Sequence, residues 1–403
     1  MSRRILIVGG GIGGLTAALA LRRAGFEPVV FEQAHALQPV GAGIQLSPNA
    51  TRALIQLGYG AGLRAIASSP QALEARSWRS GRRIFSTPLG ERCLEAYGAP
   101  YYHVHRADLH ALLSQALGPE GLRLSARCTG FAEEGDGVRV EFEDGSSEWG
   151  DLLIGADGIR SITRTVAFGP EQPRFSGNVA FRAVIPARSV EGLPLERNTT
   201  AWWGPGKHFV HYFISGGSQL NCIAVVPSRT WSVESWSTEG TREELLAEFE
   251  GWHPLVQAVI RATGRVFKWA LYDRDPLPRW SLGRVTLLGD AAHPMLPFQA
   301  QGAAQAIEDA MVLASCLSRH AEQPRVALEA YERIRKPRTS RIQEISRHNA
   351  QLFHLARQPR VLLRDTQLRF LNRHRSEKLA RRMDWLFAHD PLAVAEPSTG
   401  LGA

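Results

Sequence analysis

The chain opens on a change of hydrophobic pattern that predicts a strand, a turn, a helix and a second strand. Arg4–Val8 is a short apolar run that leads into a glycine turn, and Leu15–Ala24 is rich in Ala and Leu, which favour helices. Gly25 stands where a glycine commonly ends a helix, and Pro28–Phe31 is a second apolar run. This order is that of a βαβ unit, so the first domain is expected to contain a parallel sheet.

The pattern changes in the middle of the chain. Ala180–Ile185, His208–Ser215 and Leu220–Val226 are short, mostly apolar segments, which predicts strands of a second domain with an antiparallel sheet. A buried strand and two helical stretches then follow, at Arg284–Leu288, Gly302–Leu317 and from Ala327 to about Trp385. We therefore expect an α/β fold: a Rossmann-like domain with a parallel sheet, an α+β second domain with an antiparallel sheet, and C-terminal helices.

The glycine turn carries the first chemical signal. Gly9, Gly11 and Gly14 satisfy the spacing G-x-G-x-x-G between a strand and a helix. The first glycine permits the tight turn, the second lets the backbone approach a pyrophosphate, and the third allows close contact of helix and strand. Glu32 ends the second strand, 18 residues after Gly14, where an acid accepts hydrogen bonds from an adenosine ribose. The motif predicts a dinucleotide site but does not by itself choose between NAD and FAD.

Two aspartates follow later strands. Asp157 comes after Leu152–Ile154, and Asp290 comes after Arg284–Thr286, just before the predicted helix at Gly302. Ligands of open α/β sheets bind at the carboxyl ends of the strands, so both side chains are candidates for contact with the same ligand. Each aspartate taken alone is equally compatible with a helix N-cap.

Composition narrows the choice of partners. The net charge is +8 and arginines are spread along the chain, which favours attraction of anionic ligands over a nucleic-acid-binding stripe. No apolar run approaches the length of a membrane span. The four cysteines are scattered, without a Cys-x-x-Cys pair, so neither a zinc site nor a dithiol centre is indicated. We expect a cytoplasmic protein that binds no metal, no nucleic acid and no membrane.

Four further segments occur in a particular order: GAGIQ at 41–45, HRADL at 105–109, GADGIRS at 155–161 and LLGDAAHPM at 287–295. Together with the glycine turn, the chain resembles the aromatic-hydroxylase family of flavoprotein monooxygenases, which includes 4-hydroxybenzoate and salicylate hydroxylases. The resemblance extends from Arg4 to about Trp385. Two softer segments, WWGPGKHFVHY at 202–212 and FKW at 267–269, are similar to hydroxylases of small aromatic acids, such as 3-hydroxybenzoate 6-hydroxylase and 6-hydroxynicotinate 3-monooxygenase.

The resemblance implies FAD as the bound cofactor and NADH or NADPH as a transient co-substrate. It assigns the adenosine ribose to Glu32, the ribityl chain to Asp290, and both FAD and the nicotinamide to the Asp157 segment. The absence of a second G-x-G-x-x-G agrees with this, because relatives bind NAD(P)H without a separate Rossmann domain. The remaining implied contacts with FAD come from residues in three loops: Gln45, Arg106, Pro294, Gly302 and Ala303.

In this family, hydride reduces the flavin, O₂ gives a C4a-hydroperoxide, and its terminal oxygen passes to an electron-rich ring carbon. His208 and Tyr212, at i and i+4 on one strand face, are the candidates that activate and orient a ring hydroxyl; a structural role is the alternative. Some acid-hydroxylating relatives carry His or Gln near Pro297 and Phe298, which should line the substrate site. A polar anchor is therefore missing there or is supplied elsewhere, for instance by Gln45 or Gln299.

The expected reaction is thus hydroxylation of a small aromatic compound, a phenolic or N-heteroaromatic acid, with O₂ and NAD(P)H; homodimer formation is left open. The alternatives are epoxidation or decarboxylative hydroxylation of another substrate class, and a non-catalytic flavin-binding sensor. The FAD-binding domain is expected to be discontinuous and to comprise residues 1–72, 102–176 and 272–330. The substrate domain is expected at 73–101 and 177–271, the C-terminal helices at 331–388, and a disordered tail at 389–403.

Overall fold

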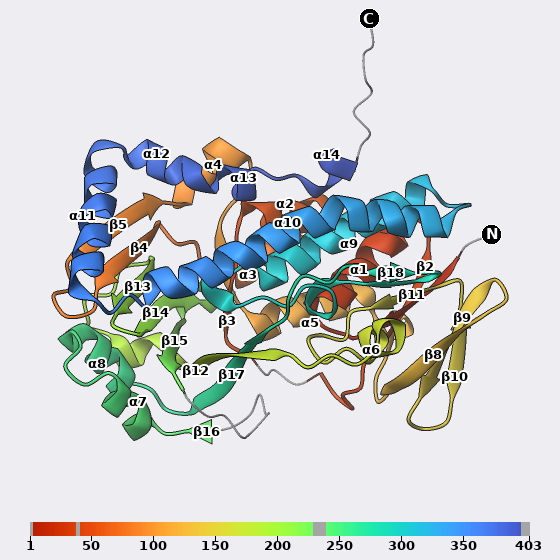
Figure 1. Ribbon diagram of the computed structural model, residues 1–403, viewed down its shortest axis with the longest axis horizontal. Helices are drawn as coiled ribbons and strands as arrows, with labels where there is room; N and C mark the ends of the chain where they lie inside the picture. The colour runs from red at the N-terminus through yellow and green to blue at the C-terminus, as the bar shows by residue number, and fades with distance from the viewer. Residues whose placement is uncertain (1–2, 38–40, 229–238, 396–403) are drawn as a thin grey trace, which may run out of the picture.

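The computed structural model describes residues 3–37, 41–228 and 239–395, and its first layer is a parallel sheet (Figure 1). This six-stranded sheet has the order β18-β19-β11-β1-β2-β7, and within the described residues its one antiparallel pair is that of the edge strand β18 with β19. Its strands are β1 (Arg4–Val8), β2 (Glu27–Phe31), β7 (Leu122–Arg123), β11 (Leu152–Gly155), β18 (Ser281–Leu282) and β19 (Val285–Leu287). The prediction of a parallel sheet at the N-terminus is confirmed.

Successive residues of the parallel strands face two different layers. Ile5 and Ile7 of β1 pack with the helices, whereas Leu6 and Val8 pack against a small antiparallel sheet on the opposite face. Because side chains alternate along a strand, a run that is apolar at every position must be covered on both faces. The covering elements are α1 (Ile12–Arg23), α2 (Pro48–Gln56), α3 (Gly60–Ile66), α5 (Arg106–Leu117) and α9 (Gly302–Arg319) on one face, and β8 (Cys128–Glu134), β9 (Gly137–Phe142) and β10 (Ser147–Gly150) on the other.

A larger sheet forms the second part of the molecule, on the left of Figure 1. It has eight described strands in the order β16-β17-β12-β15-β14-β13-β4-β5. Its pairs are antiparallel, as expected, except that β13 and β4 run parallel, since β4 comes from a distant part of the chain. The strands are β4 (Ala72–Ser77), β5 (Arg83–Pro88), β12 (Arg174–Pro186), β13 (Thr199–Gly204), β14 (Lys207–Ile214), β15 (Gln219–Pro227), β16 (Glu239–Gly240) and β17 (Val266–Asp273).

One face of the large sheet is covered by two helices that the apolar pattern did not reveal, α7 (Arg242–Glu248) and α8 (Pro254–Arg261). A two-stranded sheet of β3 (Gly43–Leu46) and β6 (Tyr102–His105) joins the two parts of the molecule. Gly43 N donates to Asn221 Oδ1 at 2.7 Å, and a Cβ at Gly43 would lie 2.7 Å from the Tyr212 ring. The small sheet therefore lies directly against β14 and β15.

The helical C-terminal part begins with α10 (Pro324–Phe353), which crosses the molecule from the parallel sheet to the large sheet (Figure 1). Its 30 residues correspond to about 45 Å. The other C-terminal helices are α11 (Gln358–His374), α12 (Ser376–Ala380), α13 (Asp384–Phe387) and α14 (Pro391–Ala395), while α4 (Gly90–Tyr97) and α6 (Ile162–Phe168) lie earlier in the chain. Most of the tail expected after residue 389 lies outside the described residues. No helix in the described ranges has the length and apolar character needed to cross a bilayer.

A buried cluster of charges holds α9 and α10 together. Arg335 of α10 donates to Asp309 Oδ1 at 2.7 Å through its Nε and forms an ion pair with Glu308, and all three side chains are fully buried. Arg338 donates to Glu308 as well, at 2.8 Å. Burial alone would raise the pKa of Glu308, but the two arginines outweigh it and hold that pKa well below its usual range.

We predict that Arg335→Met lowers the free energy of unfolding by about 3–5 kcal/mol, because it leaves buried carboxylates without their cation. Chemical denaturation followed by circular dichroism measures this, and Arg333→Met, at an exposed position of the same helix, is the control. Equal stability of the two variants would contradict the prediction. Since the carboxylate pKa values are lowered on folding, the stabilisation by these ion pairs is fully present above about pH 5 and is lost as the pH falls further.

Candidate active site

The glycine turn is built as its spacing predicts. Gly9 has φ of 111°, and a Cβ there would lie 2.3 Å from the carbonyl oxygen of Ala156. A Cβ at Gly14 would lie 2.0 Å from the oxygen of Gly9, so the start of α1 touches the turn directly. A Cβ at Gly11, in contrast, would meet no atom within 4 Å. Gly11 therefore borders open space, and a side chain there would fill the space that a ligand needs.

Glu32 faces this turn from the end of β2. Its carboxylate accepts hydrogen bonds from Gly10 N at 2.8 Å and from Ala34 N at 2.9 Å. A carboxylate has about four acceptor positions, so these two bonds fix its orientation and leave room for ribose hydroxyls. The helix N-terminus beside it has no side-chain cap, because the N-cap residue is Gly11. Free N–H groups and the positive end of the helix dipole thus remain for an anion.

The two strand-end aspartates have different surroundings. Asp157 accepts hydrogen bonds from Ser161 Oγ at 2.5 Å and from Thr163 N at 3.0 Å. Its carboxylate therefore stabilises the start of α6, as in the N-cap alternative that the sequence left open. Asp290 lies in a short turn after β19, and its side chain is accessible to solvent. Many protein atoms nevertheless surround it, and this burial raises the pKa of its carboxyl group. An exposed carboxylate deep in the protein borders an internal space, which is what a cofactor site requires.

Arg106 has the same two properties. Its side chain is exposed, yet burial lowers its pKa, and Glu32 and Asp290 act on it electrostatically. It begins α5 at the end of the two-stranded sheet. Arg106 thus lies between the carboxylate near the glycine turn and the carboxylate after β19, which places the HRADL segment along one continuous site.

The loop from Pro294 to Gln301 is held by α10. Three side chains of that helix, at three-residue intervals, donate to three alternate carbonyl groups of the loop: Gln343 to Pro294 at 2.9 Å, Ser346 to Leu296, and Asn349 to Phe298 at 3.2 Å. Pro294 is buried, while Pro297 is exposed. The loop ends at the N-terminus of α9, where Gly302 and Ala303 are half-buried and no side chain caps the helix. This second uncapped helix start suits an electron-rich group of a cofactor.

His208 and Tyr212 lie on the face of the large sheet that is turned toward this loop. The ring of His208 lies 5.4 Å from that of Phe298. Its Nδ1 is 2.7 Å from Nε2 of His354, the residue that follows α10. Burial, and then the charge of His354, lower the pKa of His208 well below 6.5, so the imidazole is neutral at neutral pH. His354 was not predicted, because 146 residues separate the pair and no local pattern marks it.

Gln45 connects the small sheet to the same face. Its Oε1 accepts a hydrogen bond from Tyr101 Oη at 2.6 Å, and its side chain also bonds to Tyr212. Tyr212 is 1% exposed, and burial raises its pKa, so its hydroxyl remains a neutral donor. Gln299, the other suggested anchor, is bonded to Asn349 Nδ2 at 2.5 Å. The structure therefore brings Gln45, Tyr212, His208 and Phe298 to one region.

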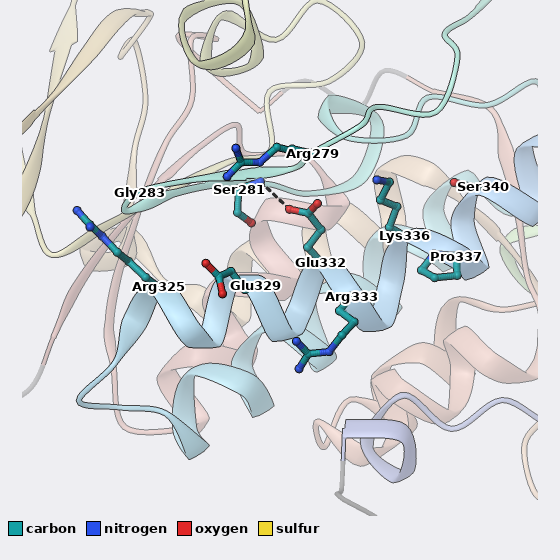
Figure 2. Close-up of a pocket in the computed structure, with 10 residues that line it drawn as sticks. All are labelled: Arg279, Ser281, Gly283, Arg325, Glu329, Glu332, Arg333, Lys336, Pro337 and Ser340. Atoms are coloured by element: carbon teal, nitrogen blue, oxygen red, sulfur yellow. Dashed lines mark hydrogen bonds between the residues drawn. The ribbon is translucent and has the colours of Figure 1, made fainter.

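A separate hollow of about 670 Å³ lies between β18 and the first half of α10 (Figure 2). Charged side chains surround it, including Arg279 just before β18 and Glu332 and Lys336 of α10, and Glu332 accepts a hydrogen bond from Ser281 N at 3.0 Å. The residues that line it include none of the predicted site residues. We do not consider it the active site. No group of three or more residues suited to hold a metal occurs in the described ranges.

Comparison with known proteins defines the class. Residues 3–346 match the family described as the FAD binding domain. The chain is 43% identical to 3-amino-4-hydroxybenzoate 2-monooxygenase of Streptomyces platensis, over 97% of both chains. It is 41% identical to 6-hydroxynicotinate 3-monooxygenase of Pseudomonas fluorescens, over 87% of this chain and 92% of that relative. The chain therefore belongs to the FAD-dependent aromatic hydroxylase family, and it is a flavoprotein monooxygenase.

Solved structures agree with this assignment. The structure of Klebsiella pneumoniae HpxO with FAD and uric acid has a TM-score of 0.87 and 30% identity, over 97% of this chain and 98% of HpxO. A salicylate hydroxylase substrate complex has a TM-score of 0.82 and 27% identity, over 99% of both chains. The site fits FAD on its own evidence: open space at Gly11, two uncapped helix starts, and the exposed interior charges of Asp290 and Arg106.

We predict that Gly11→Val folds but purifies with little flavin. The fold should tolerate the change, because the added Cβ meets no atom within 4 Å and the backbone φ of −74° is ordinary for any residue. The flavin absorbance per protein measures occupancy, and circular dichroism checks the fold. Gly264→Val, at an exposed glycine that also has free space around its Cβ, is the control. Full occupancy in Gly11→Val would show that this turn does not bind the pyrophosphate.

We also predict that Asp290→Ala weakens FAD binding by about 1.5–3 kcal/mol, the usual contribution of a hydrogen bond to a charged group. Titration of the apoprotein with FAD gives the dissociation constant, and Asp290→Asn, which keeps an acceptor oxygen, should lose less. Asp136→Ala removes a fully exposed carboxylate and is the control for the change in net charge. An unaltered dissociation constant in Asp290→Ala would disprove the contact.

Proposed function

We propose that this monooxygenase hydroxylates the ring of a small phenolic or N-heteroaromatic acid with NAD(P)H and O₂. The observation that carries the proposal is the position of His208, whose Nδ1 bonds to His354 and whose ring lies 5.4 Å from that of Phe298. The names of the relatives support the substrate class, since they act on 3-amino-4-hydroxybenzoate, 6-hydroxynicotinate and 3-hydroxybenzoate. Each of these is an aromatic acid with a ring hydroxyl.

In the proposed mechanism, Nε2 of His208 accepts the proton of the ring hydroxyl. Only the neutral imidazole can accept a proton, and the lowered pKa keeps it in that form. The hydrogen bond of Nδ1 to His354 holds the ring orientation and determines which nitrogen faces the substrate. Loss of the hydroxyl proton increases the electron density of the ring, which is the requirement for attack on an electrophilic oxygen. The bound flavin, once reduced, supplies that oxygen from O₂.

Tyr212 orients the substrate ring, and it lies on the same face of β14 as His208, four residues further along the strand. Four residues of strand separate its Cα from that of His208 by about 13 Å, so the two side chains suit opposite ends of a ring placed over Val210. The hydrogen bond between Tyr212 and Gln45 fixes the phenol relative to the small sheet. The aromatic rings of Phe298 and Phe353 lie beside His208 and limit the access of water.

The cellular setting forms part of the proposal. All four cysteines are free thiols and three of them are buried, which agrees with a reducing compartment such as the cytoplasm.

We predict that His208→Ala slows hydroxylation by a factor of about 10² to 10⁴, the usual effect of removing an acid–base group, while FAD stays bound. Flavin reduction by NAD(P)H should suffer less, so a larger share of the reducing equivalents should end in H₂O₂. The ratio of product formed to NAD(P)H consumed is the decisive measurement. His348→Ala removes an exposed histidine of α10 and should leave that ratio unchanged. Wild-type rate and coupling in His208→Ala would assign this histidine to structure alone.

A further inference from the structure

One cation near the proposed substrate site, half-buried but with a buried Nε, has no acidic partner among the described residues. Arg182 lies at the centre of β12, and its Nε is buried without a hydrogen-bond partner. The charges that act on it are those of Tyr212 and Arg106, and no acidic group of the described residues is among them. Burial lowers its pKa to about 10, which still leaves it charged at neutral pH.

The buried arginines among the described residues each have a carboxylate within ion-pair distance, Arg274 through Glu171. Arg335 pairs with Glu308 and Asp309, Arg364 with Asp365, and Arg164 with Glu171. A buried charge that has lost its partner destabilises a protein by several kcal/mol, so chains rarely keep one without use. Arg182 is therefore a cation for which the fold itself supplies no anion in the described residues.

The strand register places Arg182 on the same face as the candidate residues. Arg182 pairs with Ile223 of β15, and Ile223 pairs with Val210 of β14. Directly paired residues of antiparallel strands point to the same face, so Arg182 and Val210 share one face of the sheet. His208 and Tyr212 lie two residues before and after Val210 and therefore point to that face as well. At about 4.8 Å between strands, the Cα of Arg182 lies about 10 Å from that of Val210. Tyr212 acts electrostatically on Arg182, so the two side chains lie within electrostatic range of each other.

This part of the sheet is not fully covered. Arg182, Ile223, Val210 and Ala201 form one row across four adjacent strands, and all four are half-buried although they lie in the middle of the sheet. The guanidinium carbon of Arg182 lies 4.2 Å from the centre of the Trp269 ring, which holds the group flat against the aromatic surface. Stacking occupies the flat face of the guanidinium and leaves the donors on its edge able to bond to a ligand.

We infer that Arg182 binds the carboxylate of the aromatic substrate and makes this enzyme selective for aromatic acids. This inference rests on the proposed hydroxylation of a phenolic ring at the His208 and Tyr212 face. A guanidinium binds a carboxylate through two parallel hydrogen bonds, and the pair is strongest where water is excluded. With the carboxylate at Arg182 and Tyr212 and the hydroxyl at His208, both ends of the ring are fixed. Arg182 thus supplies the polar anchor that is missing at Pro297 and Phe298.

The test compares acids with their uncharged amides. The probes are 3-amino-4-hydroxybenzoate, 6-hydroxynicotinate and 3-hydroxybenzoate, each against its carboxamide, and dissociation constants are read from the change in flavin absorbance of the oxidised holoenzyme. The wild type should bind at least one acid more tightly than its amide. Arg182→Met should weaken that acid by roughly 10- to 100-fold, the effect of a charged hydrogen bond, and should leave the amide nearly unchanged. Arg182→Lys, which keeps the charge without the planar fork, should lie between.

Arg265→Met is the matched control, because Arg265 is exposed and lies next to the same sheet, at the start of β17. It removes one positive charge and should not alter the preference for the acid. The inference is overturned if Arg182→Met keeps the wild-type ratio of acid to amide affinity, or if it weakens both ligands equally. It is also overturned if the wild type binds no acid better than its amide. If the wild type hydroxylates none of the acids or amides, the proposed function itself is contradicted. This outcome is distinguishable from those above, which concern only the role of Arg182.

Discussion

The architecture depends on two adjacent buried carboxylates, Glu308 and Asp309, and the two arginines that pair with them. Asp309 accepts hydrogen bonds from Arg335, from Gly289 N at 3.0 Å and from His293 Nε2 at 2.6 Å. One carboxylate thus fixes the turn that carries Asp290 and attaches it to both α9 and α10. Because charges in a protein interior must be paired, these elements cannot separate without a large cost. From this fixed point α10 continues to the large sheet, where it holds the Phe298 loop and ends beside His208.

The parts of the site that the sequence predicted are those determined by local backbone geometry. Gly9, Gly11 and Gly14 are recognisable because a strand-to-helix turn around a pyrophosphate requires glycine at fixed spacing, and the structure has that turn. The parallel sheet, three strands of the antiparallel sheet and the long helices followed from the apolar pattern in the same way. Such features are determined by residues that lie close together in the sequence, so one amino-acid sequence is sufficient to infer them.

The parts that could not be predicted depend on contacts between distant residues. The pairing of His208 with His354, the parallel pairing of β4 with β13, and the ion pairs of Arg335 each join segments that no local pattern relates. The two aspartates make the same point, because similar motifs led to a helix cap at Asp157 and to an exposed interior carboxylate at Asp290. Arg182 is visible in the sequence as the one charged residue in the apolar run from Val179 to Ile185. Only the structure shows that its Nε has no hydrogen-bond partner, which is the property that suggests a ligand.

The unbroken course of α10 from Arg335 to Phe353 has a consequence for how relatives of this chain can differ in length. One residue inserted between Arg335 and Gln343 would shift the rest of the helix by about 1.5 Å and rotate it by about 100°. The row of Gln343, Ser346 and Asn349 would then point away from the loop carbonyls, and His354 would leave His208. Insertions and deletions should therefore accumulate in surface loops, while the number of residues in this segment is inherited unchanged.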